Sequence, residues 1–307
     1  MKAIQLDTYG GPEVLQLRDV IEPIPAQGEI LVDIYAASVN PVDWKLRDGS
    51  RHDRVPMKFP YTPGIDFSGV IRLVGEGVRG FAPGNEVIGV TPQTQQSTYA
   101  ETIAVDAGLV THKSKEMSHV DAAALSLVGA TAIVSLDAVD LSDKETVLIH
   151  ASAGGVGGFA VQYAKHLGAT VYATASAKNH DYVRELGADE VIDYNREDFV
   201  QRVPPCDVVY DTVGGDVHTR SFTVLKPGGR LAYVASPPAE FVPPDNVTVV
   251  RPNVTRDPKH LEKVVELHRV GAVKPMAVEE LALADAVKAH QISALGHVRG
   301  KLVFKIR

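Results

Sequence analysis

The sequence predicts an α/β protein in which a β-rich part is followed by a doubly wound parallel sheet. Three observations support this fold class. Residues 1 to about 115 contain short, partly alternating runs rich in β-branched residues. From about residue 118, strand-like segments alternate with helix-like ones. Around residues 150–157, a glycine-rich turn joins a short apolar strand to a helix.

The β-rich part is defined by its strands and by the turn signals between them. Residues 29–36 and 67–74 are predicted strands, and turns are indicated at residues 10–12, 60–64 and 82–85. This spacing is typical of a small barrel or sandwich. The strand-like tail at residues 301–307 follows a predicted helix near residues 284–291, and we expect it to return to this first part.

The second part shows a regular alternation of elements. An Ala- and Leu-rich helix is expected to begin at residue 118. Strands are then predicted at residues 146–150, 170–174, 190–193, 208–211 and 230–235. Helices are predicted at residues 157–167 and 180–186, and Gly168 and Gly187 stand where a helix-ending glycine belongs. This alternation predicts a parallel sheet covered by helices.

Composition narrows the class of protein. The chain has 307 residues, a net charge of −7 and 45% hydrophobic residues, which argues against nucleic acid or an anionic membrane as the main partner. We see neither a membrane span nor a signal peptide and expect a cytoplasmic protein. The single cysteine, Cys206, excludes an intramolecular disulfide and is expected to be a core thiol. Most of the 11 histidines are expected at the surface.

The most informative segment is the glycine-rich turn, whose spacing is Ser152-x-Gly154-x-x-Gly157. Gly154 and Gly155 would let the backbone approach a pyrophosphate, and Gly157 would let the helix pack on the strand. The helix N-terminus offers unpaired N–H groups and partial positive charge to phosphates. A glycine-rich turn without a ligand is the alternative. The strand–turn–helix context favours nucleotide binding.

The end of the second strand predicts which nucleotide is bound. NAD-binding folds place Asp or Glu there to hold the ribose 2′-OH, whereas residues 173–178 contain no acid. Ser176 could donate a hydrogen bond to a 2′-phosphate, Lys178 could neutralise it, and Tyr194 could add a hydroxyl. Alternatively, Lys178 is only a solvated residue at a helix start. We expect NADPH rather than NADH.

Several motifs together resemble the zinc-free quinone oxidoreductases of the medium-chain dehydrogenase/reductase superfamily. The resemblance is carried by residues 151–157, 186–194 and 225–230 in the middle of the chain. It extends through residues 38–44, 63–69 and 296–303, so it runs nearly from end to end. It implies a GroES-like catalytic domain at residues 1–120 and 275–307, and a Rossmann NADPH-binding domain at residues 121–274. It also implies a quinone or α,β-unsaturated carbonyl substrate and a homodimer.

The resemblance further implies roles for individual residues. Asn40 would face the nicotinamide ribose and the substrate, and Thr131 would lie near the nicotinamide, which makes both catalytic candidates. Val234 and Ser236 would border the nicotinamide, and Arg299 and Lys301 would lie near the phosphates. The complete set of implied cofactor-binding residues is Asn40, Thr131, Gly154, Gly155, Val156, Gly157, Ser176, Lys178, Tyr194, Val234, Ser236, Arg299 and Lys301.

The zinc alcohol dehydrogenases are a more distant resemblance, and their metal ligands are replaced. Their Gly-His-Glu triplet is matched by residues 64–66, where Ile65 stands in place of histidine, and Asn40 takes the place of the first cysteine. We therefore expect no metal, and hydride transfer to a carbon that conjugation already makes electron-poor. Asn40 could donate a hydrogen bond to the substrate oxygen. Asp43 and Asp66 are available carboxylates, with Asp43 expected to be a structural acceptor, but no general acid stands out.

Other functions remain open at this stage. An enoyl-thioester reductase of the same superfamily would need a tyrosine donor and a basic channel, and no basic cluster is visible. A non-catalytic NADPH-binding protein would bind the cofactor without turnover. RNA binding is disfavoured by the net charge.

Overall fold

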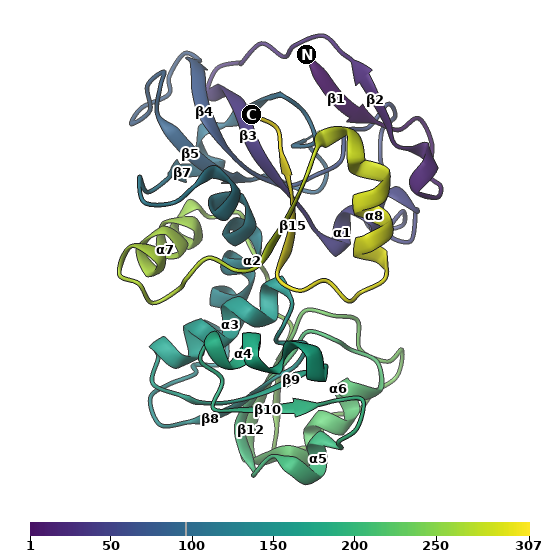
Figure 1. Ribbon diagram of the computed structural model, residues 1–307, viewed down its shortest axis with the longest axis vertical. Coiled ribbons are helices and arrows are strands. Elements are labelled where there is room, and N and C mark those ends of the chain that lie inside the picture. Colours follow the sequence, from purple (N-terminus) through teal and green to yellow (C-terminus); the bar gives the residue numbers. More distant parts are fainter. Residues whose placement is uncertain (96) are drawn as a thin grey trace. The chain divides into compact units, whose positions relative to one another are not determined.

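The computed structural model describes residues 1–95 and 97–307, which fold into two compact units (Figure 1). The first unit contains Met1–Leu127, Arg256–Arg269 and Pro275–Arg307, and the second contains Val128–Thr255 and Val270–Lys274. The helix α7 (Pro258–Arg269) therefore belongs to the first unit, where it packs on strands β5 (Glu86–Val90) and β7 (Val110–His112). The domain boundaries predicted from the sequence placed these residues in the central domain instead.

The first unit is built on a seven-stranded sheet in the order β14-β15-β3-β4-β5-β7, with β6 also paired to β3. All of these pairs are antiparallel except β14 with β15. A separate hairpin-like pair joins β1 (Lys2–Gln5) to β2 (Gln16–Asp19). The strands of the large sheet are β3 (Glu29–Val39), β4 (Asp66–Val74), β5 (Glu86–Val90), β6 (Thr102–Asp106), β7 (Val110–His112), β14 (Val278–Leu281) and β15 (Lys301–Lys305). Because β15 pairs with β3, the predicted return of the tail to this unit is confirmed.

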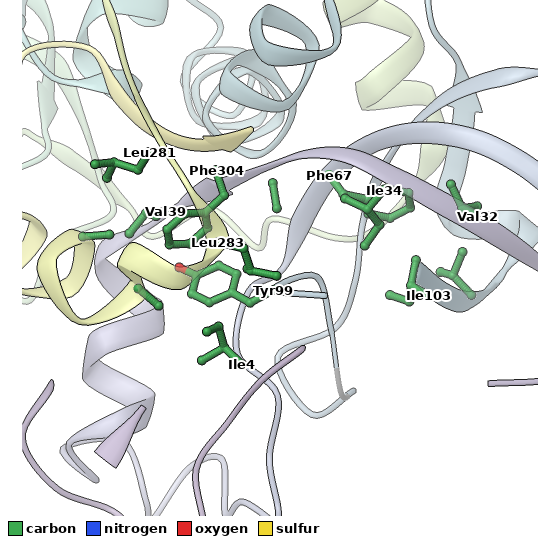
Figure 2. Close-up of a cluster of buried hydrophobic side chains, with 14 of the residues drawn as sticks. Ile4, Val32, Ile34, Val39, Phe67, Tyr99, Ile103, Leu281, Leu283 and Phe304 are labelled. Carbon is green, nitrogen blue, oxygen red and sulfur yellow. The ribbon is translucent and has the colours of Figure 1, made fainter. Parts of the chain in front are cut away.

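The core of the first unit joins residues from both ends of the chain. Figure 2 shows Tyr99 close to Leu283 and Phe304, which come from the C-terminal segment. The Tyr99 ring meets the edge of Phe304 at a centroid distance of 4.8 Å. Helices α1 (Pro41–Arg47) and α8 (Ala286–Ala294) pack against each other beside this core. This packing fixes the end of β3, where the first candidate site residue lies.

The second unit is a six-stranded parallel sheet in the order β10-β9-β8-β11-β12-β13. The strands are β8 (Thr146–Ile149), β9 (Thr170–Ala175), β10 (Glu190–Asp193), β11 (Cys206–Asp211), β12 (Leu225–Tyr233) and β13 (Thr248–Val250). Its helices are α3 (Gly155–His166), α4 (His180–Glu185), α5 (Phe199–Arg202) and α6 (Asp216–Ser221). The strand order reverses between β8 and β11, which confirms the predicted doubly wound sheet and places its ligand-binding edge there.

The local helix signals were mostly correct. Gly168 and Gly187 follow α3 and α4 with φ of +87° and +110°, the left-handed conformation that ends helices. Helix α3 begins at Gly155, two residues earlier than predicted. Helix α2 (His119–Asp137) connects the two units, and among the described helices it alone is long and apolar enough to span a membrane. Two-thirds of its apolar window, 67%, is buried inside the protein, as in a core helix.

Burial confirms the cysteine prediction and adds an exception to the histidine one. Cys206 is fully buried. Four histidines are exposed and four are partly exposed, but His150, His218 and His290 are 2%, 0% and 0% exposed. No spacing rule in the sequence marks these three positions as buried.

Candidate functional site

In the first unit, a buried polar cluster forms where β3 ends at Asn40. Pro41 begins α1 at the next position, so Asn40 keeps an extended backbone, with φ of −122°, and its side chain is 3% exposed. Its Nδ2 donates to Asp66 Oδ1 at 2.8 Å, and its Oδ1 accepts from Lys301 Nζ at 2.6 Å. Because a carboxylate only accepts and an ammonium only donates, these two partners fix the orientation of the amide.

Asp66 and Lys301 are each the first residue of a strand and are both buried. The Ser38 hydroxyl donates to the Asp66 carboxylate and lies 2.9 Å from Oδ1 and 2.8 Å from Oδ2. Lys301 Nζ also donates to the carbonyl of Val39 at 2.8 Å. Burial raises the pKa of Asp66 and lowers that of Lys301, and the attraction between the two charges opposes both shifts. The ammonium is thus held by internal acceptors, which gives no support to the cofactor-phosphate contact inferred for Lys301.

Asp43 extends the cluster along α1. Its Oδ2 accepts from the backbone N–H of Asn40 at 2.7 Å and from the hydroxyl of Tyr99 at 2.9 Å, so it is the structural acceptor that we expected. Its Oδ1 is buried and has no hydrogen-bond partner among the residues that the structure describes. Burial, reinforced by repulsion from Asp66, raises the pKa of Asp43 to about 7. Asp43 therefore holds a proton up to near-neutral pH.

Two partly buried cations of the first unit were not predicted as site residues from the sequence, and one of them, Arg256, interacts with Asp66. Arg256 Nε donates to the carbonyl of Thr91 at 3.2 Å, and its pKa is lowered by burial and raised by attraction to Asp66. No local motif marks Arg256, so the sequence offered no signal for it. Lys45 Nζ lies 5.3 Å from the centroid of the Trp44 ring, and burial lowers its pKa. Lys45 directly follows a motif that we had singled out and could have been included.

In the second unit, the glycine-rich turn after β8 has the geometry of a phosphate cradle. Ala151 adopts a left-handed backbone with φ of +48°, and Gly154 caps α3. A Cβ on Gly157 would lie 2.5 Å from the carbonyl oxygen of Ala151, so only glycine lets the helix approach the turn this closely. A Cβ on Gly154 would meet only that oxygen, at 3.4 Å. Gly155 and Val156 form the first turn of α3 and are partly exposed, so their N–H groups lie at the open end of the helix.

The predicted 2′-phosphate residues come together at the ends of neighbouring strands. Ala175 of β9 is paired in register with Asp193 of β10, so Ser176 and Tyr194 follow side by side at the carboxyl edge. Ser176 is partly exposed, whereas Lys178 and Tyr194 are exposed, Tyr194 by 49%. The adjacent Arg196, not predicted from the sequence, lies 3.8 Å from Asp193 and has an 83% exposed side chain. This edge offers hydroxyls and cations to an anion.

The remaining predicted residues divide between the units. In the second unit, the N–H of Val234 donates to the carbonyl of Asp211 at 3.1 Å, and the carbonyl of Ser236 accepts from Gly215 at 3.1 Å, so both residues lie at the end of β12. Thr131 is partly exposed in α2, and its carbonyl accepts from Ser135 Oγ at 2.6 Å. Arg299 is exposed and belongs to the first unit with Asn40 and Lys301.

The positions that hold zinc in the more distant family carry other chemistry here. Ile65 is 1% exposed and apolar, and the amide oxygen of Asn40 already accepts from Lys301. Within residues 1–95 and 97–307, no group of three or more His, Cys, Asp and Glu side chains is arranged to hold a metal ion. The donor set therefore does not fit a catalytic zinc.

Comparisons with known proteins place both units in one family, although the second matching model below begins in the second unit and continues into the C-terminal part of the first. A family model described as the alcohol dehydrogenase GroES-like domain matches residues 26–123, and one described as zinc-binding dehydrogenase matches residues 186–304. The chloroplastic quinone oxidoreductase of Triphysaria versicolor is 32% identical over 99% of this chain and 98% of its own length. The 2-methylene-furan-3-one reductase of Solanum lycopersicum is 34% identical over 99% of this chain and 78% of its own length.

A solved structure gives the same result. The Escherichia coli quinone oxidoreductase, solved in complex with NADPH, superposes with a TM-score of 0.88 and 28% identity, covering 99% of this chain and 100% of that one. This similarity covers both the GroES-like unit and the Rossmann-type parallel sheet. The chain therefore belongs to the quinone oxidoreductase family of the medium-chain dehydrogenase/reductase superfamily.

Proposed function

We propose that this protein is an NADPH-dependent reductase that transfers hydride to a quinone or an α,β-unsaturated carbonyl compound without zinc. The observation that carries the proposal is the Asn40–Asp66–Lys301 cluster, in which Asn40, at the position of a zinc ligand in the more distant family, is bound by a carboxylate and an ammonium instead. The names of the Triphysaria and tomato relatives, a quinone oxidoreductase and an enone reductase, support this substrate class.

The second unit fits a nicotinamide dinucleotide. Gly154, at the N-cap of α3, presents no side chain that would stand between its backbone and a pyrophosphate. Gly157 lets the helix start close to the turn, because a Cβ there would lie 2.5 Å from the carbonyl oxygen of Ala151. Ser176, Lys178 and Tyr194 would hold a 2′-phosphate, and the acid that disfavours NADPH is missing from residues 173–178. NADPH, when bound, would supply the hydride. The NADPH complex of the E. coli relative supports this choice.

Asn40 is suited to orient the substrate oxygen. One of its N–H groups donates to Asp66 at 2.8 Å, whereas the other has only long contacts with Ser38, at 3.4 Å. The second N–H is therefore the one available to a substrate. Lys301, bound to the amide oxygen, polarises the amide and makes this N–H a stronger donor. Negative charge that reaches the oxygen of a quinone or enone would be stabilised there.

The test is an NADPH-oxidation screen over quinones, alkenals, cyclic enones, an enoyl thioester and simple alcohols. We expect turnover of a quinone or enone and no appreciable NADP-dependent oxidation of ethanol or benzyl alcohol. Asn40→Ala should lower kcat/KM by about a hundredfold, the loss typical of one oxyanion donor. NADPH binding without turnover of any compound would overturn the proposal in favour of a non-catalytic binding protein, and selective thioester turnover would favour an enoyl-thioester reductase.

Assembly and location stay predictions of the sequence. We propose a cytoplasmic homodimer whose ligands are small molecules rather than nucleic acid or membrane. Light scattering during size-exclusion chromatography tests the dimer, and a monomer at micromolar concentration would contradict it.

A further inference from the structure

A fully buried histidine–aspartate pair lies at the end of β11, outside the residues assigned above. His218 Nδ1 is 2.8 Å from Asp211 Oδ2, and both side chains are 0% exposed. The edges and faces of Phe222, Tyr233 and Phe241 surround the imidazole at centroid distances of 5.4, 4.9 and 4.7 Å. Within residues 1–95 and 97–307, His218 Nε2 has no hydrogen-bond partner, so the polar contact of this ring is the one with the carboxylate.

The same carboxylate shapes the loop that follows β11, residues 212–215, which we term the β11 loop. Asp211 Oδ1 accepts from the backbone N–H groups of Val213 and Gly214 at 2.9 and 2.8 Å. Gly215 donates to the carbonyl of Ser236 after β12, and a Cβ on Gly214 would lie 2.2 Å from that same carbonyl oxygen. Asp211 and Ser236 thus hold the backbone of the β11 loop, and His218 is the side chain that contacts Asp211.

A second buried histidine ties the β11 loop to the phosphate turn. Thr212 Oγ1 donates to the carbonyl of His150 at 2.7 Å. Ser221 Oγ donates to the carbonyl of Val217 at 2.6 Å, so it accepts from His150 Nε2 at 3.0 Å. His150 Nδ1 is then the acceptor, and Thr174 Oγ1, which also accepts from the N–H of Ala151, donates to it at 3.2 Å. Burial lowers the pKa of His150 to about 4, which keeps the ring neutral as this pattern requires.

Both histidines therefore connect α6 to the ligand-binding edge of the sheet. His218 and Ser221 lie three positions apart on α6, so they share one helix face. His218 reaches the β11 loop through Asp211, and Ser221 reaches the phosphate turn through His150. These two loops flank the reversal of strand order between β8 and β11, where a doubly wound sheet binds a dinucleotide.

We propose that His218 is a positioning residue that acts through Asp211 to hold the β11 loop in the conformation that receives the nicotinamide half of the cofactor. This inference rests on the proposed function. The adenine half of a dinucleotide belongs to the β8–β9–β10 side of such a sheet and the nicotinamide half to the β11–β12 side. Loss of the His218 contact should therefore weaken binding of the nicotinamide half and leave the adenine half almost unaffected.

The experiment compares NADPH with adenosine 2′,5′-bisphosphate, which carries only the adenine half and its 2′-phosphate. His218→Phe keeps a ring among the three aromatic side chains but removes the donor to Asp211. We expect it to raise the Kd of NADPH about tenfold, the effect of one charge-assisted hydrogen bond, while the Kd of the bisphosphate stays within about twofold. His218→Gln, which places its amide too far along the side chain, should behave in the same way. His218→Asn, whose amide nitrogen can occupy the place of Nδ1, should restore most of the NADPH affinity.

Phe241→Leu is the matched control, because it loosens the packing around the imidazole without touching the carboxylate contact. It should lower thermal stability and leave the ratio of the two Kd values unchanged. Equal losses of NADPH and bisphosphate in folded His218 variants would overturn the inference by showing a merely structural role. So would unchanged NADPH affinity in His218→Phe or His218→Gln. A wild-type protein that binds neither compound would instead overturn the proposed function, so the two failures are distinguishable.

Discussion

The buried carboxyl of Asp43 should make the stability of the first unit depend on pH in a direction opposite to that of most carboxyls. In the folded chain its pKa rises from an ordinary value of 3.8 to about 7, because burial disfavours the charged form and Asp66 repels it. We therefore expect the free energy of unfolding to fall as the pH rises through this window, since the folded state binds more protons than the unfolded state.

The size of the effect follows from the two pKa values. A tenfold difference in proton affinity corresponds to about 1.4 kcal/mol, so the step from 3.8 to about 7 amounts to about 4 kcal/mol. The charge of Asp43 also acts on its neighbours, because it repels Asp66 and attracts Lys301. When Asp43 ionises, the attraction to Lys301 offsets part of the loss in the free energy of unfolding. We expect a net change of about 2–4 kcal/mol between pH 4 and pH 8.

The perturbation is Asp43→Asn, which cannot ionise. Its amide oxygen can still accept from Asn40 and Tyr99, as Asp43 Oδ2 does in the wild type. The assay is urea unfolding at a series of pH values, read by the fluorescence of Trp44. This is the only tryptophan of the chain and the next residue along α1, so it reports on the first unit. The variant should gain stability relative to the wild type as the pH rises.

A matched control separates this effect from the titration of other groups. Asp181→Asn removes a carboxylate whose side chain is 95% exposed, and it shows the effect of losing one acidic side chain at the surface. If the difference between Asp43→Asn and the wild type also stayed constant from pH 4 to pH 8, Asp43 would not be the buried proton-binding group described here. A difference that grew toward low pH would contradict the sign of the argument.

The other predictions concern the cofactor site and the absence of metal. Gly154→Ala should keep the stability of the wild type and weaken NADPH binding about tenfold in calorimetry, whereas Gly157→Ala should also lower Tm, because its Cβ would lie 2.5 Å from the backbone. Undiminished binding in folded Gly154→Ala would place the pyrophosphate elsewhere. Lys178→Ala should reduce the preference for NADPH over NADH at least about tenfold in kcat/KM, since a charged hydrogen bond contributes about 1.5–3 kcal/mol and Lys178 is exposed to screening. Ser176→Asp should reduce it further, and an unchanged ratio in both variants would refute the assignment. Purified protein should contain no stoichiometric zinc and lose no activity to chelators, and about one zinc per chain in elemental analysis would show that this prediction is wrong.

Local signals in the sequence predicted the parts of the fold that depend on neighbouring residues. Gly168 and Gly187 end helices because their positive φ suits glycine, and this conformational preference is visible without any tertiary contact. The side-by-side placement of Ser176 and Tyr194 could be predicted for a related reason. Both directly follow strands that are consecutive in the chain and adjacent in the sheet, so their alignment requires only parallel pairing in register.

The polar cluster of the first unit could not be predicted in this way. Asn40 meets Asp66 across 26 residues and Lys301 across 261 residues, so both contacts depend on the pairing of β3 with β4 and β15. Lys301 looks like any solvated lysine at the start of a strand until that pairing turns it inward. The buried pair of His218 and Asp211 was missed although the two residues lie seven positions apart. No pattern in the sequence distinguishes a histidine in the core from a histidine at the surface.

The charge balance of the cluster explains why these ionisable groups are tolerated in a core. A buried ion pair rarely stabilises a fold more than apolar side chains of similar volume would, so its presence is better explained by a need for polar chemistry. Lys301 and Asp66 carry one charge each and bind the two ends of the same amide, which leaves the Asn40 amide polarised and fixed. A second buried carboxylate would repel that of Asp66. The pKa of Asp43, raised to about 7 by burial and by this repulsion, means that the carboxyl keeps its proton up to near-neutral pH. The stability lost when Asp43 ionises is therefore a consequence of holding Asn40 ready to donate a hydrogen bond.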